Sequence, residues 1–191
     1  MVKGVISDLH YQKEKSLILL VHNRIVSKEK YWQTALSEID FSFQPIVNIH
    51  NGVCYGCEAL LRNYKAAGFE LIDDLFDKAY EEQMLYPIEL ALREKAIRKF
   101  SQLEWNRQAK LFINLDNRVL DSEDYTSGNT LRILEKYGLS LDALCFEISE
   151  KHELRNAQEA TEILNLYRGQ GFKIAVDDCG TGFSGLKLLY Y

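Results

Sequence analysis

The chain has 191 residues, of which 47% are hydrophobic and 27% charged, and its formal net charge is −5. This balance is typical of a globular protein with a sizeable core, and the absence of any Lys/Arg run longer than two residues argues against a nucleic-acid polymer as partner. The longest apolar run near the start, Leu17–Val21, is too short for a membrane span or a signal-peptide core. We therefore expect a cytoplasmic protein.

Residues 1–35 carry no sharp pattern and are expected to form an N-terminal extension of unknown role, preceding a domain over residues 36–191. Within this region Leu17–Val21 and Ile25–Val26 could be strands, whereas Lys30–Ile39 could be a helix that leads into the domain. No segment rich in proline, glycine or serine marks a boundary between the two parts.

A β-hairpin is predicted next. Phe43–Ile49 and Val53–Leu61 are rich in β-branched and aromatic residues, and Asn51-Gly52 lies between them. An Asn-Gly pair between two such runs is a strong hairpin signal, because both residues tolerate the positive φ angles of a tight turn. The two strands are therefore expected to be antiparallel neighbours.

After the hairpin, helical and extended patterns alternate. Helices are expected over residues 71–85 (apolar face Leu71, Leu75, Phe76, Ala79 and Tyr80), from Pro87 onward (Ala91, Leu92, Ala96, Ile97 and Phe100), over Thr130–Tyr137 and over Asn156–Gln170. Strands are expected at Leu111–Leu115, Leu144–Ile148 and Lys173–Asp177. This order predicts parallel strands covered by helices, either in an α/β barrel or in a doubly wound sheet.

Oxygen donors lie near the ends of four predicted strands: Glu58, Asn114, Glu147, and Asp177 with Asp178. Charges at the end of apolar strands would be costly in a core, but strand ends converge on one site at the carboxyl rim of a parallel barrel. Oxygen donors without thiolate or imidazole favour Mg²⁺ or Mn²⁺, and adjacent aspartates can serve two metal ions. Solvated strand ends would explain one such residue better than four in succession.

Two other motifs have simpler interpretations. Gly180 to Gly185 spell Gly-x-Gly-x-x-Gly, but the aspartates just before this turn would face the pyrophosphate of a dinucleotide, so a mobile loop attached to the aspartates fits better. Cys54 and Cys57 form Cys-x-x-Cys without a second ligand pair, and positions i and i+3 of a strand point to opposite faces. We expect buried free thiols there.

Five motifs together resemble, in order and spacing, the motifs of EAL phosphodiesterases: Gln44-Pro-Ile-Val47, Glu58-Ala-Leu-Leu-Arg62, Phe112-Ile-Asn114-Leu, Phe146-Glu-Ile-Ser-Glu150 and Asp177-Asp-Cys-Gly-Thr-Gly182. The resemblance covers residues 36–191. It implies an α/β fold, a modified (β/α)₈ TIM-type barrel with an antiparallel first strand. The chain is expected to lack the last three strands of that barrel.

The resemblance also implies a function: metal-dependent hydrolysis of cyclic di-GMP to linear pGpG at a site for two Mg²⁺ or Mn²⁺ ions. It assigns catalysis to Glu58, Asp177 and Asp178, and metal binding to these three with Asn114 and Glu147. The ligand would contact Gln44, Leu60, Arg62 and Asn114. Glu150 would steady a regulatory loop containing Gly180, Thr181, Gly182 and Phe183, and so couple ligand binding to metal loading and to a homodimer.

The alternative is a catalytically inactive module that binds cyclic di-GMP or a protein partner. It is favoured by the expected absence of the last strands, which in the family carry a catalytic lysine, a metal-binding glutamate and a base-contacting glutamine. The chain alone is therefore expected to have little or no hydrolase activity, although a full-length parent would have it. Intact ligands in the first part of the domain favour the enzyme. An upstream sensory or partner domain would supply the input signal in either case.

Overall fold

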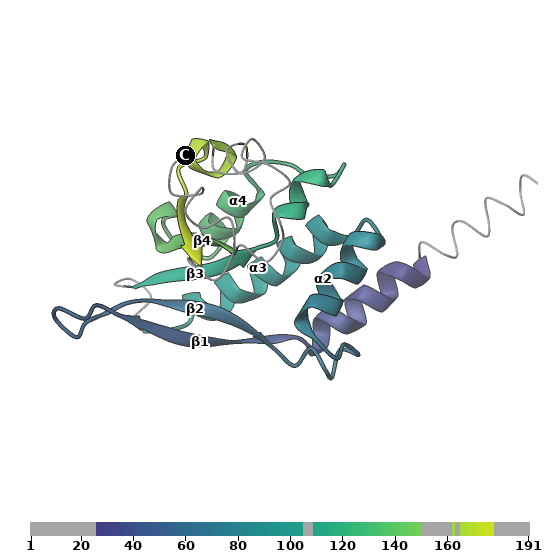
Figure 1. Ribbon diagram of the computed structural model, residues 1–191, viewed down its shortest axis with the longest axis horizontal. Coiled ribbons are helices and arrows are strands. Elements are labelled where there is room, and N and C mark those ends of the chain that lie inside the picture. Colours follow the sequence, from purple (N-terminus) through teal and green to yellow (C-terminus); the bar gives the residue numbers. More distant parts are fainter. Residues whose placement is uncertain (1–25, 105–108, 150–161, 163–164, 178–191) are drawn as a thin grey trace, which may run out of the picture.

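The computed structural model of the protein describes residues 26–104, 109–149, 162 and 165–177 (Figure 1). A single five-stranded sheet has the order β1-β2-β3-β4-β5. The elements are β1 (Asp40–Val47), β2 (Cys54–Arg62), α2 (Ile72–Glu81), α3 (Leu85–Ser101), β3 (Lys110–Leu115), the 3-10 turn η1 (Asn117–Asp121), α4 (Asn129–Lys136), the 3-10 turn η2 (Leu141–Ala143), β4 (Leu144–Ser149) and β5 (Lys173–Asp177). In the described part of the chain this sheet is open.

The sheet has the predicted topology. β1 pairs with β2 in antiparallel fashion, and β2, β3, β4 and β5 are parallel neighbours. The connection of the hairpin is longer than predicted, because β1 ends at Val47 instead of Ile49 and β2 begins at Cys54 instead of Val53. Within this connection the Asn48 N–H donates to the Val53 carbonyl at 2.9 Å. Gly52 has a φ of +70°, which is the conformation that made this position a turn signal.

The helices differ from their predicted bounds in understandable ways. α2 begins at Ile72, so Leu71 lies outside the apolar face and is 61% exposed. α3 begins at Leu85, two residues before Pro87. Proline is tolerated at this position because the N–H groups of the first helical turn have no partner within the helix, so the lack of one breaks no hydrogen bond. The last predicted helix is described only at residues 162 and 165–169, before Gly171 with its φ of +89°.

A helix over residues 26–38 packs against the rest of the protein and continues across residue 35. Its Trp32 and Ala35 are 2% and 3% exposed and belong to the same core as the sheet. The indole N–H of Trp32 donates to Glu82 Oε2 at 2.8 Å, and Lys95 Nζ donates to the carbonyl of Leu36 at 2.7 Å. A strand at Ile25–Val26 is therefore wrong at Val26, which is helical, and Leu17–Val21 lies outside the described residues.

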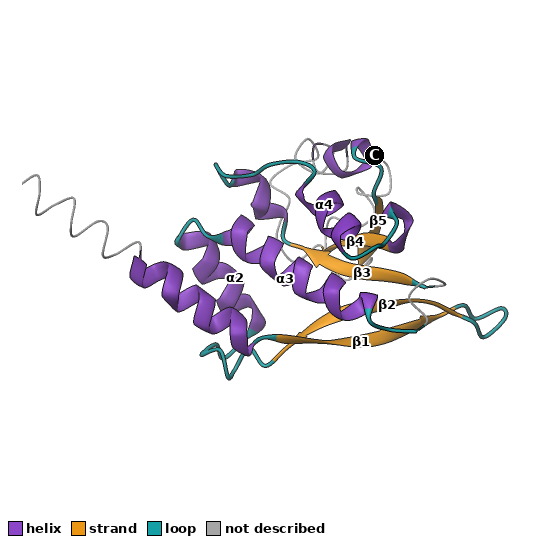
Figure 2. Cartoon of the chain, turned by 180° about the vertical axis from the view of Figure 1, so that it is seen from behind, coloured by secondary structure: helices purple, strands orange, loops and turns teal. Residues whose placement is uncertain are grey.

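The two faces of the sheet have different roles because side chains alternate along each strand. One face packs on the helices and supplies the core, with α3 crossing over the strands (Figure 2). Its buried residues on β3 and β4 are Leu111, Ile113, Leu115, Leu144, Phe146 and Ile148. Residues of the opposite face, which we call the site face, take the positions between them. Within the described ranges no helix has the length and apolar character needed to cross a bilayer.

Candidate functional site

The site face gathers the predicted polar residues because the strand register aligns them. Gln44 on β1 pairs with Glu58 on β2, and Asn114 on β3 pairs with Glu147 on β4. Glu58 pairs with Phe112, so Asn114 lies one pleat further along the neighbouring strand, on the same face. The strand register thus brings together three oxygen-bearing side chains from β2, β3 and β4. Asn114 and Glu147 lie near the carboxyl ends of their strands, whereas Glu58 lies in the middle of β2, four residues before its end at Arg62, and not near the strand end that the sequence suggested.

Glu58 and Asn114 are in direct contact. The side-chain Nδ2 of Asn114 donates a hydrogen bond to Glu58 Oε1 at 2.9 Å. In this orientation the amide donor holds the carboxylate, while the amide oxygen faces elsewhere and keeps its capacity to accept or to ligate. Asn114 is exposed and Glu58 half-buried, so both can be reached from solvent. The pair therefore has the chemistry of an oxygen-donor cation site.

Glu147 extends this group toward the next strand. It is only 8% exposed although it is charged, and it lies beside Asn114 in the β3–β4 register. Among the described residues there is no cluster of three or more His, Cys, Asp or Glu side chains suited to a metal ion. The structure therefore shows two carboxylates and one amide of the predicted ligand set.

The rest of the predicted ligand set is described less fully. The backbone of Asp177 pairs with Ser149 at the end of β5, which places it at the same end of the sheet. Asp178 lies outside the described residues, as do Glu150 and the loop residues Gly180, Thr181, Gly182 and Phe183. Their roles stay predictions.

The predicted ligand-binding residues follow Glu58 on the site face. Gln44 is exposed directly opposite Glu58, and Leu60 and Arg62 occupy the next two site-face positions of β2. Arg62 is exposed and donates from Nη1 to the carbonyl of Leu61 at 2.9 Å. Its guanidinium thus stands at the carboxyl end of β2, at the same end of the sheet as the oxygen donors, where it is suited to bind a phosphate.

Sequence reasoning missed a buried ion pair beneath this site. Glu89 and Arg93 on α3 are 5% and 4% exposed, and Arg93 Nη2 donates to Glu89 Oε2 at 2.8 Å. Glu89 Oε1 accepts from the Asp116 N–H at 2.8 Å. Burial raises the pKa of Glu89, and the Arg93 charge and the Asp116 N–H oppose that rise. The available signal was an i,i+4 Glu-Arg pair on an otherwise apolar helix.

The two thiols of the Cys-x-x-Cys pair differ in exposure. Cys57 is fully buried in the core, whereas Cys54 is half-buried, so the prediction of buried thiols is confirmed for Cys57 only. Both are free cysteines. Burial raises the pKa of the Cys57 thiol to about 12, which keeps it protonated near neutral pH and suits a packing role.

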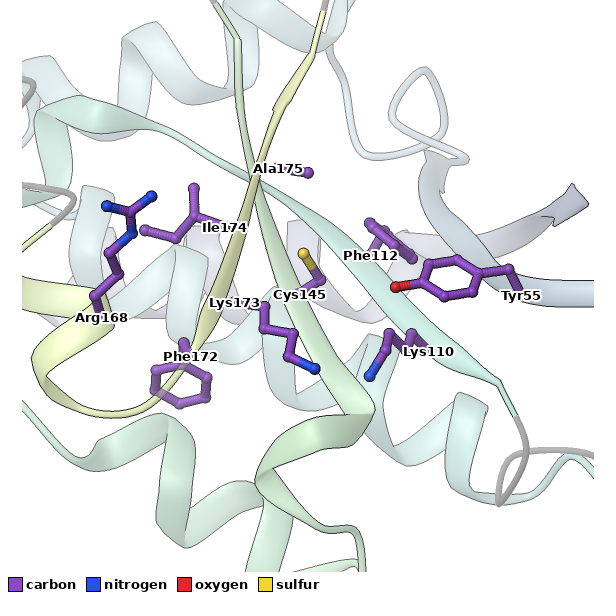
Figure 3. A pocket seen from close by; sticks show the side chains of 9 residues that line it. All are labelled: Tyr55, Lys110, Phe112, Cys145, Arg168, Phe172, Lys173, Ile174 and Ala175. Atoms are coloured by element: carbon purple, nitrogen blue, oxygen red, sulfur yellow. The ribbon is translucent and has the colours of Figure 1, made fainter. Parts of the chain in front are cut away.

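A cavity of about 430 Å³ lies at the other end of the strands (Figure 3). Lys110 and Lys173, the first residues of β3 and β5, both contact Asp142: Lys110 Nζ donates to its carbonyl at 2.7 Å and Lys173 Nζ is 3.2 Å from its Oδ1. The lining is Tyr55, Lys110, Phe112, Cys145, Arg168, Phe172, Lys173, Ile174 and Ala175. It includes none of the predicted site residues.

Comparison with known proteins agrees with the arrangement of the strands. The family model of the EAL domain matches residues 30–191. The chain belongs to the EAL domain family. The family prediction made from five motifs is thus confirmed. The match begins inside the helix over residues 26–38, which shares the core of the sheet.

Relatives of known structure or name extend this result. The Escherichia coli protein named probable cyclic di-GMP phosphodiesterase PdeB is 30% identical over 177 residues, covering 90% of this chain and 34% of PdeB. The manganese and cyclic di-GMP complex of Klebsiella pneumoniae BlrP1 is 27% identical with a TM-score of 0.65, covering 80% of this chain and 38% of BlrP1. A standalone EAL protein of Vibrio cholerae in its c-di-GMP-bound form is 28% identical with a TM-score of 0.61, covering 80% and 62%.

These structures settle the fold class. The described sheet belongs to the TIM-like barrel of the EAL domain, so a doubly wound sheet is excluded. The chain spans about a third of the length of PdeB.

Proposed function

We propose that this chain carries the site of a metal-dependent phosphodiesterase that opens cyclic di-GMP to linear pGpG. The observation that carries the proposal is the set formed by Glu58, Asn114 and Glu147 on three adjacent strands of one sheet face, with Asn114 donating to Glu58 at 2.9 Å. Relatives named as cyclic di-GMP phosphodiesterases, and EAL structures in complex with that ligand, support the choice of substrate.

The residues present fit a hard divalent cation. Carboxylate and amide oxygens are the ligands that Mg²⁺ and Mn²⁺ prefer, and no histidine lies on the site face of the described strands. Cys145 lies on that face two residues before Glu147, but burial raises the pKa of its thiol to about 11, which keeps it protonated near neutral pH. We assign Glu58, Asn114 and Glu147 as ligands together with Asp177 and Asp178, of which Asp178 would help to hold a second ion. When bound, such ions supply a Lewis acid for the phosphate and lower the pKa of water.

The proposed site residues have different tasks in this hydrolysis. A water oxygen forms a bond to one phosphorus, the bond from that phosphorus to the sugar 3′ oxygen breaks, and the leaving oxygen takes up a proton. Glu58, Asp177 and Asp178 are the carboxylates proposed to orient that water and receive its proton. Arg62 and Gln44, at the same end of the sheet, hold the ligand, and Leu60 supplies an apolar contact. A homodimer and a cytoplasmic location are part of the same proposal.

The test is to incubate the chain with cyclic di-GMP and Mn²⁺ and to resolve the nucleotides chromatographically. Formation of pGpG, even if slow, that disappears in Asp177→Asn is the expected result for the enzyme. Arg168→Ala, which changes an exposed arginine of the opposite cavity, is the matched control and should retain turnover. Binding of cyclic di-GMP without turnover would instead support the inactive binding module, and absence of both binding and turnover would refute the proposal.

A further inference from the structure

The buried ion pair of α3 calls for an explanation beyond stability. The side chains of Glu89 and Arg93 are 5% and 3% exposed, and they contact each other at 2.8 Å. Removing two charges from water costs free energy that their mutual attraction often fails to offset, and apolar residues of similar volume are frequently at least as stable. What distinguishes the pair is therefore the groups that it contacts on the sheet.

The glutamate of the pair contacts the end of β3. Glu89 Oε1 accepts a hydrogen bond from the Asp116 N–H at 2.8 Å. Asp116 directly follows the last residue of β3 and comes two residues after Asn114. The chain turns at this point, because the Asp116 carboxylate accepts from the Arg118 N–H at 3.0 Å and begins η1. The carboxylate of Glu89 thus fixes the position at which β3 leaves the sheet.

The arginine of the pair contacts β4. The Arg93 guanidinium lies 4.8 Å from the centre of the Phe146 ring, and Phe146 immediately precedes Glu147 on β4. Arg93 Nη1 also donates to Thr130 Oγ1 at 2.8 Å, which ties α4 to the same point. One ion pair therefore contacts the backbone two residues after Asn114 and the side chain one residue before Glu147, from the face opposite to both.

We propose that Glu89 and Arg93 are positioning residues. They hold β3 and β4 so that Asn114 and Glu147 lie side by side, where both can bind one divalent cation. The inference rests on the proposed function, since it concerns the same metal site. Metal–ligand distances tolerate only about 0.2 Å of error, so a small shift of either strand end moves a ligand out of range. Loss of residues that orient metal ligands typically lowers metal affinity by about 10–100-fold.

The experiment compares two double variants by calorimetric titration of the chain with Mn²⁺. Glu89→Leu/Arg93→Met replaces the pair by apolar side chains and removes the acceptor of the Asp116 N–H. Glu89→Gln/Arg93→Met also removes both charges but retains an acceptor at residue 89. We expect the Leu variant to bind Mn²⁺ about 10–100-fold more weakly, even where its thermal unfolding matches that of the wild type. The Gln variant should lose less affinity than the Leu variant, because it keeps an acceptor for the Asp116 N–H, but it should remain weaker than the wild type because the contacts of Arg93 with Phe146 and Thr130 are gone.

Two single variants complete the design. Ile97→Val, fully buried on the same helix, should lower stability and leave Mn²⁺ affinity unchanged. Arg93→Lys keeps the positive charge but loses the planar guanidinium, and it should weaken Mn²⁺ binding. This single variant keeps the inference testable where a double variant does not fold.

The outcomes separate this inference from the proposed function. Wild-type Mn²⁺ affinity in both double variants, or affinity that simply follows unfolding temperature across all variants, would overturn the positioning role. Equal affinity in the wild type and Glu58→Gln would remove the metal site itself, and both proposals would fall together. A strong effect of Glu58→Gln with no effect at Glu89 and Arg93 would overturn the inference alone.

Discussion

The two ends of the site face carry different polar side chains. Along β3 the site-face residues run from Lys110 through Phe112 to Asn114, and along β5 the series begins with Lys173. Lysines thus stand at the amino ends of β3 and β5, whereas the oxygen donors, together with Arg62 of β2, lie toward the carboxyl ends. Asn114 lies four positions after Lys110, a distance of about 13 Å along the strand, which exceeds the Debye length of about 8 Å at physiological salt.

This separation shows how one face can hold opposite charges without neutralising either. The lysines contact Asp142 in η2 at their own end, so they do not compete with a metal ion for Glu58 or Glu147. The aromatic ring of Phe112 lies between the two groups on β3. A change at one end should therefore leave the chemistry of the other end intact, and this expectation can be tested directly.

The largest effect is expected for metal binding. Glu58→Gln removes a proposed carboxylate ligand and should lower Mn²⁺ affinity by at least about 100-fold, since even residues outside the ligand set cost about 10–100-fold. Lys173→Gln, at the amino end of β5, should leave that affinity unchanged. Isothermal titration of both variants with Mn²⁺ makes the comparison. Similar losses in the two variants would show that the ends of the face are not independent.

The next effect concerns the nucleotide. Arg62→Ala at the carboxyl end should reduce the binding free energy of cyclic di-GMP by about 1.5–3 kcal/mol, the range for a hydrogen bond to a charged group. Arg168→Ala, an exposed arginine beside the opposite cavity, is the matched control. Fluorescence titration gives both dissociation constants. An unchanged constant for Arg62→Ala would refute the phosphate contact.

A third effect tests the packing between the two ends. A Cβ atom at Gly56 would lie 2.6 Å from the Lys110 carbonyl oxygen and 2.7 Å from the Phe112 ring. Gly56→Ala should therefore force β2 and β3 apart and lower the free energy of unfolding by about 1–3 kcal/mol. Gly169→Ala, with nothing within 4 Å, is the control and should be neutral or stabilising. Chemical denaturation of the two variants measures both values.

Much of this arrangement could be predicted from the sequence because its signals are local. Asn51-Gly52 indicated antiparallel strands, and the apolar run before Asn114 placed it near the end of its strand, although Glu58 lies in the middle of β2. The contact between these two side chains depends on the register of β2 against β3, which no short pattern specifies. The resemblance to EAL domains supplied that register indirectly, by naming both residues as ligands of one site.

The misses have a common physical origin. The apolar pattern of α3 suggested Ala91 for its buried face, yet Ala91 is half-buried and Arg93 is fully enclosed. Charged residues are normally exposed unless they are paired, so an apolar pattern does not select Glu89 and Arg93 for the buried face. Their partners, the Asp116 N–H and Thr130, become visible only in three dimensions. The helix over residues 26–38 extends beyond its predicted start for a similar reason, since its stability comes from the core contacts of Trp32.

The smallest effect is expected for Glu82, a charged residue that lies away from both ends of the site face and contributes only to the stability of the fold. The hydrogen bond from Lys78 lowers the pKa of Glu82 below 4.5, its ordinary value in an unfolded chain; burial opposes this, and the Trp32 indole N–H assists it. Since the folded state binds this proton less readily than the unfolded state, Glu82 stabilises the fold above pH 4.5. That stabilisation is lost as pH falls through the lowered pKa.

Glu82→Gln should therefore reduce the free energy of unfolding by less than about 1 kcal/mol at neutral pH, because the pair with Lys78 is partly exposed. The difference from the wild type should shrink steadily as the pH falls from 4.5. The fluorescence of Trp32 reports the docking of the helix over residues 26–38, in a Trp105→Phe background since the chain has two tryptophans. Glu135→Gln, on the exposed side of α4, controls for the loss of any one carboxylate. A difference that grows on acidification would contradict the ion pair, because only a carboxylate whose pKa rises on folding behaves in that way.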